Sequence, residues 1–300
     1  MDNKAPIIIF CYRRKINKLI NSLLKNKDTI KSDLFIFSDG FKSVKDKNDV
    51  ISLRKSLNQI SGFKTITIFN SNKNNGLANS IIKGLKYVLN IYDKAIILED
   101  DLIVSPKFIE FMNDALSFYK DNKKIWSISG YSPPLNCFKS LKGEVYLSVR
   151  PYSWGWATWS DRLNKADWSN KSFLKLEGNK KKIKEFELGG NDLYRMFELQ
   201  YLGKIDSWAI QWCYSQFVNS SYSVIPKTSL TQNMGFYDNL GTHNKSGGLR
   251  WKVNLAQTKI NPHNISPDTE FLTCFKKYHD LTIFSKFKYF LKKWFVKKIK

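Results

Sequence analysis

Short apolar runs alternate with amphipathic stretches along the first half of the chain. The amphipathic stretches include residues 16–24 and 77–89, which predict helices with one buried face. The apolar runs predict five buried strands, at residues 7–12, 34–38, 65–69, 94–98 and 125–128. This order of elements predicts an α/β protein with a Rossmann-like, mostly parallel and twisted sheet flanked by helices.

The composition changes after residues 131–134, where Tyr-Ser-Pro-Pro follows the fifth strand. The chain then becomes rich in aromatic residues, with six tryptophans between residues 154 and 212. A length of 300 residues suits one large domain. We therefore predict one domain in two halves, 1–130 and 131–275, followed by a tail at 276–300.

The tail has the pattern of a basic amphipathic helix. Apolar residues between 283 and 295 recur at three- and four-residue spacing, and lysines fill most of the other positions. This pattern predicts a helix on the surface of anionic lipid, and the alternative is a helix docked on the chain's own core. No segment has the apolar length of a membrane-spanning helix, so we expect any membrane contact to be peripheral. The first residues lack the apolar region of a signal peptide, which argues against export.

The chain carries 49 Lys and Arg against 26 Asp and Glu, a formal net charge of +23. Such a charge attracts anions, but nucleic acid, acidic lipid and phosphorylated substrates all qualify. The four cysteines show neither a CxxC pair nor the spacing of metal ligands; they are Cys11, Cys137, Cys213 and Cys274. We expect unpaired thiols in a reducing compartment.

Candidate chemistry begins where the fourth strand ends, because its apolar run stops in Glu99, Asp100 and Asp101. Ligands of open α/β sheets bind beyond the carboxyl ends of the strands. Three adjacent carboxylates repel one another, and Mg²⁺ or Mn²⁺ together with a polyphosphate would compensate their charge. We therefore expect a nucleotide-sugar site here; the alternative is a solvated acidic turn.

Polar residues also follow the first two strands. Cys11 and Arg13 come at the end of the first strand, and Asp39 comes at the end of the second. A carboxylate can accept the ring N–H of uracil, and an arginine donates directional hydrogen bonds to a base or a phosphate. The alternatives are a packing role for Cys11 and a surface charge for Arg13.

Taken in order, these motifs resemble those of inverting GT-A glycosyltransferases, in particular the N-acetylglucosaminyltransferase I type and its bacterial relatives that build surface polysaccharides. The resemblance covers roughly residues 5–245. It implies that the first half binds the nucleotide sugar: Cys11 and Arg13 would hold the nucleotide, and Asp39 would contact uracil.

In this family an acidic motif binds the metal, and Glu99, Asp100 and Asp101 resemble its Glu-Asp-Asp version. The resemblance implies that Asp101 binds Mn²⁺ or Mg²⁺, with Glu99 as a further candidate ligand. Asp100 would face the ribose or the sugar of the donor.

The second half would bind the acceptor and catalyse the transfer. Residues 205–208, Ile-Asp-Ser-Trp, resemble the family's Trp-Asp-Asp-Trp motif, although isoleucine and serine replace the first Trp and the second Asp. The resemblance implies that Asp206 is the catalytic base, which removes the proton of the acceptor hydroxyl as that hydroxyl attacks. Asp192 and Glu198 are the alternative bases.

Aromatic residues of the second half are candidates for the acceptor site. Trp154, Trp156 and Trp208 offer flat apolar faces that suit sugar rings, although packing in the core is the commoner use of a tryptophan. His243 lies in a segment flanked by glycines that would form a lid over the nucleotide. We expect it to touch the diphosphate or the metal; the alternative is a structural histidine.

These features predict a metal-dependent, inverting glycosyltransferase that moves a hexosyl or N-acetylhexosaminyl group from a UDP-sugar to a glycan. The expected acceptor is a lipid-linked O-antigen, capsule or lipooligosaccharide precursor, at the cytoplasmic face of a bacterial inner membrane. The alternatives are a metal-dependent nuclease and a non-catalytic protein that binds anionic lipid or nucleic acid. Neither alternative needs Asp39 or Asp206, and no segment resembles a known nucleic-acid-binding module. The sequence leaves the sugar, the linkage and the oligomeric state open.

Overall fold

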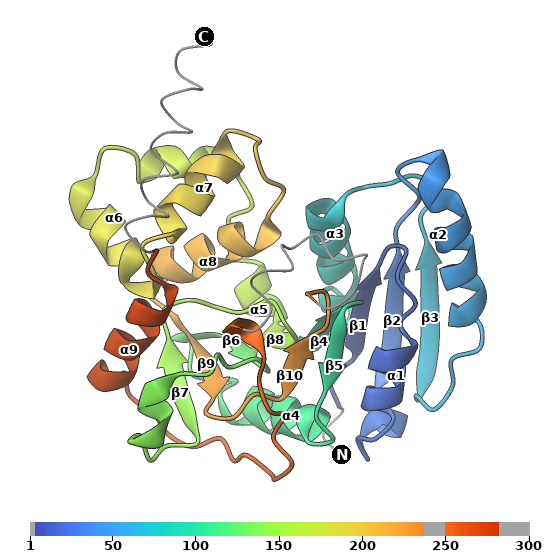
Figure 1. Ribbon diagram of the computed structural model, residues 1–300, viewed down its shortest axis with the longest axis horizontal. Helices are drawn as coiled ribbons and strands as arrows, with labels where there is room; N and C mark the ends of the chain where they lie inside the picture. The colour runs from blue at the N-terminus through green and yellow to red at the C-terminus, as the bar shows by residue number, and fades with distance from the viewer. Residues whose placement is uncertain (1–3, 237–249, 282–300) are drawn as a thin grey trace.

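The computed structural model describes residues 4–236 and 250–281. Its centre is an eight-stranded sheet in the order β3-β2-β1-β4-β8-β6-β9-β7 (Figure 1). All five strands predicted from the apolar runs belong to it: β1 (Ile7–Cys11), β2 (Asp33–Ser38), β3 (Thr65–Asn70), β4 (Lys94–Glu99) and β6 (Ile125–Ser129). The predicted α/β class, with a mostly parallel sheet flanked by helices, is confirmed.

The parallel half of the sheet aligns the carboxyl ends of three strands. β1 lies between β2 and β4, and its register pairs Cys11 with Ser38 and Phe10 with Glu99. The polypeptide therefore leaves the sheet at the same edge after each of these three strands. The loops that follow β1, β2 and β4 are brought together there.

The other half of the sheet contains strands that the apolar pattern did not predict. β8 (Trp156–Trp159) runs antiparallel to both β4 and β6, while β9 (Tyr222–Pro226) is parallel to β6. β7 (Val145–Ser148) is antiparallel to β9 and forms the edge. A separate two-stranded sheet pairs β5 and β10, which are Leu102–Val104 and Thr231–Asn233.

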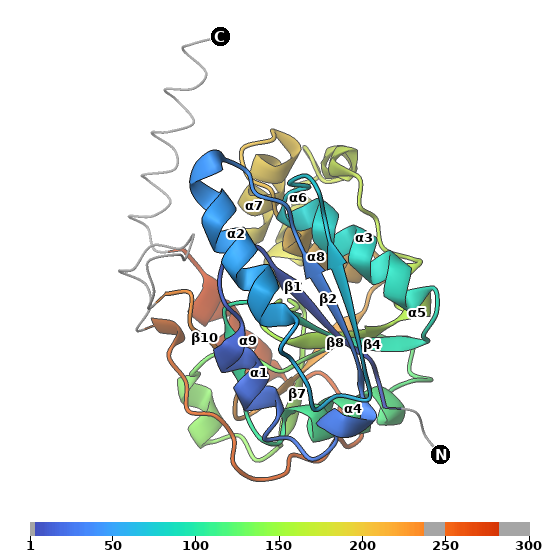
Figure 2. The ribbon, with the colours of Figure 1, turned by 90° about the vertical axis from the view of Figure 1, so that its right-hand side faces the viewer.

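Side chains alternate between the two faces of β1 and meet different helices on each face. Ile7 and Ile9 belong to the core cluster of α1, α2 and α4, whereas Ile8 and Phe10 belong to that of α3 and α8. Figure 2 shows α1 and α2 apart from α3 across the sheet. The bounds of these helices are Asn17–Leu23 for α1, Val44–Leu57 for α2, Leu77–Leu89 for α3, Phe108–Phe118 for α4 and Trp208–Val218 for α8.

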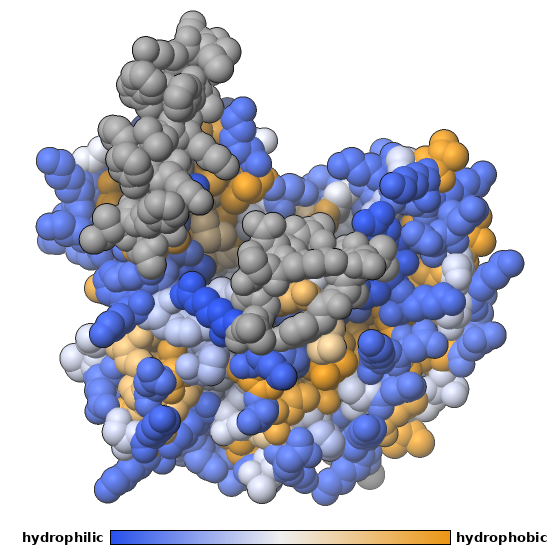
Figure 3. All heavy atoms as spheres, viewed as in Figure 1, coloured by the Kyte–Doolittle hydropathy of each residue, from blue (hydrophilic) through white to orange (hydrophobic). Residues whose placement is uncertain are grey.

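Further helices extend the second half of the chain. α6 (Lys180–Phe186) and α7 (Leu193–Tyr201) share an apolar cluster with α8, and the short α5 (Ser160–Leu163) follows β8. α9 (Thr269–His279) packs against β7. The space-filling view shows a hollow between the side that carries α7 and α8 and the side that carries α2 and α3 (Figure 3).

The expectation of four unpaired thiols is wrong for two of them. Cys137 and Cys274 form a disulfide, while Cys11 and Cys213 are buried free thiols. The paired residues are separated by 137 positions, so no local spacing indicates the bond. They meet because α9 packs against the turn that contains Cys137, with 6.4 Å between their Cα atoms.

The predicted amphipathic helix lies mostly outside the described residues. α9 ends at His279 and the description ends at residue 281, so most of the tail at 276–300 stays a prediction. Within residues 4–236 and 250–281, no helix has the length and apolar character needed to cross a membrane.

Candidate functional site

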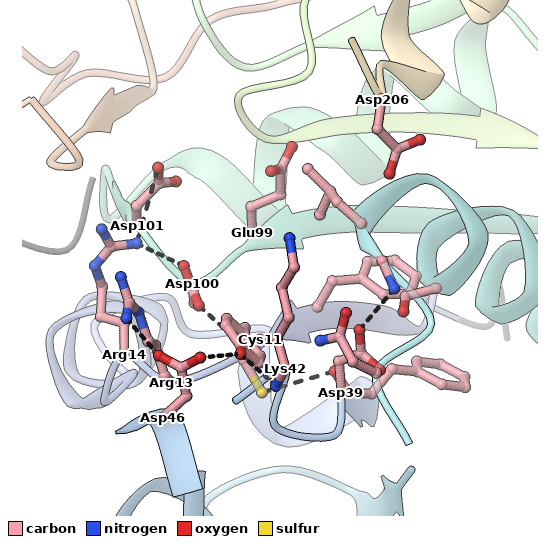
Figure 4. A pocket seen from close by; sticks show the side chains of 17 residues that line it. Cys11, Arg13, Arg14, Asp39, Lys42, Asp46, Glu99, Asp100, Asp101 and Asp206 are labelled. Carbon is pink, nitrogen blue, oxygen red and sulfur yellow. Dashed lines mark hydrogen bonds and ion pairs between the residues drawn. The ribbon is translucent and has the colours of Figure 1, made fainter. Parts of the chain in front are cut away.

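A pocket of about 530 Å³ opens at the carboxyl ends of β1, β2 and β4 (Figure 4). It brings together residues that are as many as 196 positions apart, since Phe10 and Asp206 both line it. Every described residue that was predicted to bind the donor or the metal, or to act as the base, lies on its wall: Cys11, Arg13, Asp39, Glu99, Asp100, Asp101 and Asp206.

The acidic cluster stands at the point where β4 leaves the core. Residues 95–98 are fully buried, and Glu99 is the first side chain to reach the pocket. Burial, followed by the charges of Asp101 and Asp100, raises the pKa of Glu99 well above its usual range. Burial also raises the pKa of Asp100 to about 6, against the opposing charge of Arg14.

Arg14 is a pocket residue that the sequence analysis missed. Its Nη1 lies 2.7 Å from Oδ1 of Asp100 and 4.0 Å from Oδ2 of Asp101. The backbone N–H of Tyr12 donates to the other oxygen of Asp100, at 3.2 Å. Asp100 is therefore held by the loop after β1, and Arg14 places one positive charge beside two of the three carboxylates.

Asp101 is held in place by β10 and the two residues that follow this strand. Its backbone oxygen accepts from the N–H of Met234 at 2.6 Å, and its Oδ2 accepts from Nδ2 of Asn233 at 3.2 Å. A Cβ atom at Gly235 would lie 2.6 Å from the same Oδ2, so a side chain at that position would displace the carboxylate. The pairing of β5 with β10 thus sets the position of Asp101.

The donor atoms of this cluster fit a hard divalent cation. Mg²⁺ in nucleotide enzymes is usually held by one or two carboxylates, with phosphates and water completing the shell. Glu99 and Asp101 offer such oxygens on one turn, whereas both oxygens of Asp100 are engaged by Arg14 and Tyr12. Within the described ranges, no group of three or more His, Cys, Asp or Glu is arranged so that it could hold a metal ion.

Asp39 is bound to the backbone of a neighbouring loop. Its carboxylate accepts from the N–H groups of Gly40, Asn75 and Gly76 at 2.9 to 3.1 Å, and its exposed fraction is 8 %. Most of its acceptor capacity is therefore used inside the protein. Gly76 in turn lies beside Asp206, because a Cβ at that glycine would be 3.2 Å from Oδ2 of Asp206. Asp39 positions the loop that adjoins the predicted base.

Arg13 is directed to a partner that the sequence analysis also missed. Its Nη1 lies 2.7 Å from Oδ1 of Asp46, whose other oxygen accepts from the hydroxyls of Tyr12 and Ser43. These contacts hold the pKa of Asp46 below its usual range, and the hydrogen bond from Ser43 has the largest effect. Cys11 lines the pocket, but burial raises the pKa of its thiol far above the ordinary value, which fits a packing role.

Asp206 enters the pocket from the loop before α8, whereas the acidic cluster enters from the end of β4 (Figure 4). Its side chain is exposed, and the next residue is anchored by a hydrogen bond from its N–H to Oε1 of Gln200, 2.7 Å long. The alternative bases lie elsewhere. Asp192 forms a bidentate ion pair with Arg150, at 2.7 and 3.0 Å, and neither Asp192 nor Glu198 lines the pocket.

The expected acceptor wall is only partly present. Trp154 is half-buried, but Trp156 and Trp208 have exposed fractions of 1 % and 3 % and stack on each other in the core. The prediction that these two rings offer a face to a sugar is wrong for this structure, because α8 packs them against the sheet. His243 lies outside the described residues.

Comparisons with known proteins do not assign a family. No protein-family model matches the chain, and no curated protein matches it. Among solved structures, it is similar to the mannosyltransferase PcManGT from Pyrobaculum calidifontis in complex with GDP-Man and Mn²⁺, with 9 % identity and a TM-score of 0.38, over 73 % of this chain and 70 % of that chain.

Two further similarities are at the same level. A putative glucose-1-phosphate thymidylyltransferase from Bacillus anthracis in complex with a sucrose has 12 % identity and a TM-score of 0.41, over 84 % of this chain and 97 % of that chain. The 4-diphosphocytidyl-2C-methyl-D-erythritol synthase from Anaerococcus prevotii has 9 % identity and a TM-score of 0.34, over 74 % and 86 %. Such values do not identify a reaction, so the function must be inferred from the pocket itself.

Proposed function

We propose that this protein is a metal-dependent, inverting glycosyltransferase that uses a nucleoside diphosphate sugar. One observation carries the proposal: the acidic cluster after β4 and the separate carboxylate of Asp206 line a single pocket at the carboxyl edge of the sheet. A cluster that suits a metal and a diphosphate explains donor binding. A second, exposed carboxylate on another element explains proton removal from an acceptor.

In the proposed reaction, Asp206 accepts the proton of the acceptor hydroxyl as that hydroxyl attacks the anomeric carbon. Its exposure suits this role, since an acceptor hydroxyl can reach the carboxylate from the solvent side of the pocket. Asp101 and Glu99 would hold the cation, which when bound supplies positive charge to the leaving diphosphate. Arg14 keeps Asp100 in place beside them.

The balance of charge in the pocket supports the need for a cation. Its lining contains six acids and three bases, although the whole chain has a net charge of +23. A nucleoside diphosphate would add further negative charge to this site. A divalent cation offsets both, as expected for carboxylates and phosphates that share one site.

Uridine as the base and a hexosyl or N-acetylhexosaminyl group as the sugar are proposed from the family resemblance. The acceptor is proposed to be a glycan, lipid-linked and destined for O-antigen, capsule or lipooligosaccharide. Trp154 is the described candidate for its contact, being half-buried beside the strand that pairs with β4. The basic tail would keep the enzyme on the cytoplasmic face of the inner membrane, close to such acceptors.

The test is a screen of UDP- and GDP-sugars for release of free nucleoside diphosphate by the full chain, with Mn²⁺ and then with EDTA. We expect release from at least one UDP-sugar, only with the metal, and its loss in Asp206→Asn. Asp121→Asn is the matched control, because Asp121 is exposed and does not line the pocket. Cleavage of nucleic acid without release from any sugar nucleotide would favour the nuclease alternative instead.

A further inference from the structure

The pocket has three cationic side chains, and two of them are already paired. Arg13 is bound to Asp46 and Arg14 to Asp100, each at 2.7 Å. The third is Lys42, in the loop after β2. Within residues 4–236 and 250–281, its ammonium group has no hydrogen bond and no ion pair. Figure 4 shows its side chain extending into the pocket toward Glu99.

The backbone of Lys42 is anchored although its side chain is not. Its N–H donates to the hydroxyl oxygen of Tyr12 at 2.8 Å, and the same hydroxyl donates to Asp46 at 3.0 Å. Tyr12 thus ties the loop after β1 to the loop after β2. The Cα of Lys42 is fixed at the rim of the pocket, while four methylene groups leave the ammonium free to move within it.

We propose that Lys42 binds the diphosphate of the nucleotide, an inference that rests on the proposed function. A diphosphate placed beside Glu99 and Asp101 needs positive charge on its other side, and both arginines of the pocket are held by carboxylates. An ammonium group is a compact charge with three donors, which suits phosphate oxygens of varying position. Lys42 is therefore a binding residue for the phosphates, and Tyr12 is its positioning residue.

The competing explanation is that Lys42 only offsets the negative charge of the acidic pocket or is a solvated surface residue. The two explanations differ in what they predict for ligands with and without phosphate. A phosphate-binding lysine affects a nucleoside diphosphate and leaves the nucleoside unaffected. A lysine that only maintains the pocket affects both ligands equally, or neither.

The experiment is calorimetric titration of UDP, uridine and inorganic pyrophosphate into the full chain with Mn²⁺. We expect Lys42→Met to weaken UDP and pyrophosphate binding by about tenfold, the scale of one charge-assisted hydrogen bond, with uridine unchanged. Lys42→Arg should restore most of the affinity. Lys45→Met is the matched control, because Lys45 is exposed at the start of α2 and does not line the pocket.

Equal weakening of UDP and uridine, or no change for either, would overturn the inference while leaving the proposed function in place. If the unaltered chain binds neither UDP nor pyrophosphate with Mn²⁺, the proposed function fails as well. Thermal unfolding of each variant identifies any loss that comes from misfolding, and Lys42→Gln provides a second neutral variant if Lys42→Met unfolds.

Discussion

At the scale of single residues, Asp101 has the best-defined position in the acidic cluster. The N–H of Met234 fixes its backbone oxygen, while Asn233 and the lack of a side chain at Gly235 fix its carboxylate. If it holds the metal, Asp101→Asn should abolish transfer and weaken UDP binding mainly when metal is present. Calorimetry of UDP with Mn²⁺ and then with EDTA measures this. Equal loss in both conditions would mean that Asp101 is structural.

Replacing Asp206 should have the opposite effect: the rate of transfer should fall while binding of the donor is almost unchanged. Its side chain is exposed and forms no part of the core, so Asp206→Asn should fold normally and bind the donor almost as well as the parent. Turnover should fall by roughly a hundredfold or more, the scale of losing a general base. The measurement is kcat with saturating acceptor beside the Kd of UDP. A mutant that keeps most of its kcat would place the base elsewhere.

The sequence predicts the place of the pocket but not the partners of its charged groups. The acids after β4 and the polar residues after β1 and β2 were identified because strand ends converge at one edge. The sequence does not show that Arg14, and not Arg13, contacts the acidic cluster. The two side chains point in different directions, and their partners, Asp100 and Asp46, come from distant parts of the chain. Asp39 illustrates the same limit, because two of the three N–H groups that it accepts from lie 36 and 37 residues further along the chain.

At the scale of elements, the sequence predicts β1, β2, β3, β4 and β6 but not the shorter or later strands β5, β7, β8, β9 and β10. Residues 7–11 and 95–98 are apolar runs buried on both faces, which is the strongest local signal for a strand. β8 and β10 are four and three residues long, and long-range pairing rather than local pattern forms them. The tryptophans around β8 look alike in sequence, so burial of Trp156 but not Trp154 follows only from the packing of α8.

The last turn of α9 carries a buried histidine that should make stability depend on pH. Burial first, and then the charges of Arg150 and Arg250, lower the pKa of His279 well below its usual range. Its Nε2 lies 2.5 Å from the hydroxyl of Tyr152, and its exposed fraction is 6 %. The folded protein thus keeps this ring neutral, whereas the unfolded chain takes up a proton below pH about 6.5.

Because the folded-state pKa is depressed, the stability contributed by neutral His279 is present above pH 6.5 and is lost as the pH falls. The loss can reach about 2 kcal/mol of unfolding free energy at pH 5. His279→Gln should be less stable than the parent at pH 7.5 but should lose less stability on going to pH 5. Urea unfolding at both pH values tests this, and parallel losses in the two proteins would rule it out.

At the scale of the whole molecule, the distribution of charge separates two surfaces. The pocket is lined by more acids than bases, yet the chain has a net charge of +23, so the excess of positive charge lies outside the pocket. The last 19 residues, 282–300, contribute many of these lysines together with aromatic side chains. We expect this segment to bring the protein to anionic membranes.

Each lysine near an anionic leaflet contributes on the order of 1 kcal/mol and is screened by salt, while buried aromatic side chains add a term that salt does not remove. Co-sedimentation with anionic liposomes should therefore weaken with salt without vanishing, and a form that ends at Leu281 should not sediment. Truncation at this point retains Asp280, which accepts from the N–H of Asn191 at 2.9 Å, and leaves α9 intact.

A full chain with Lys180, Lys181 and Lys182 changed to Gln is the matched control, since these lysines are exposed on α6. If it loses as much binding as the truncated form, overall charge rather than the tail carries the attraction. If truncation unfolds the protein, the tail belongs to the core and the membrane role fails.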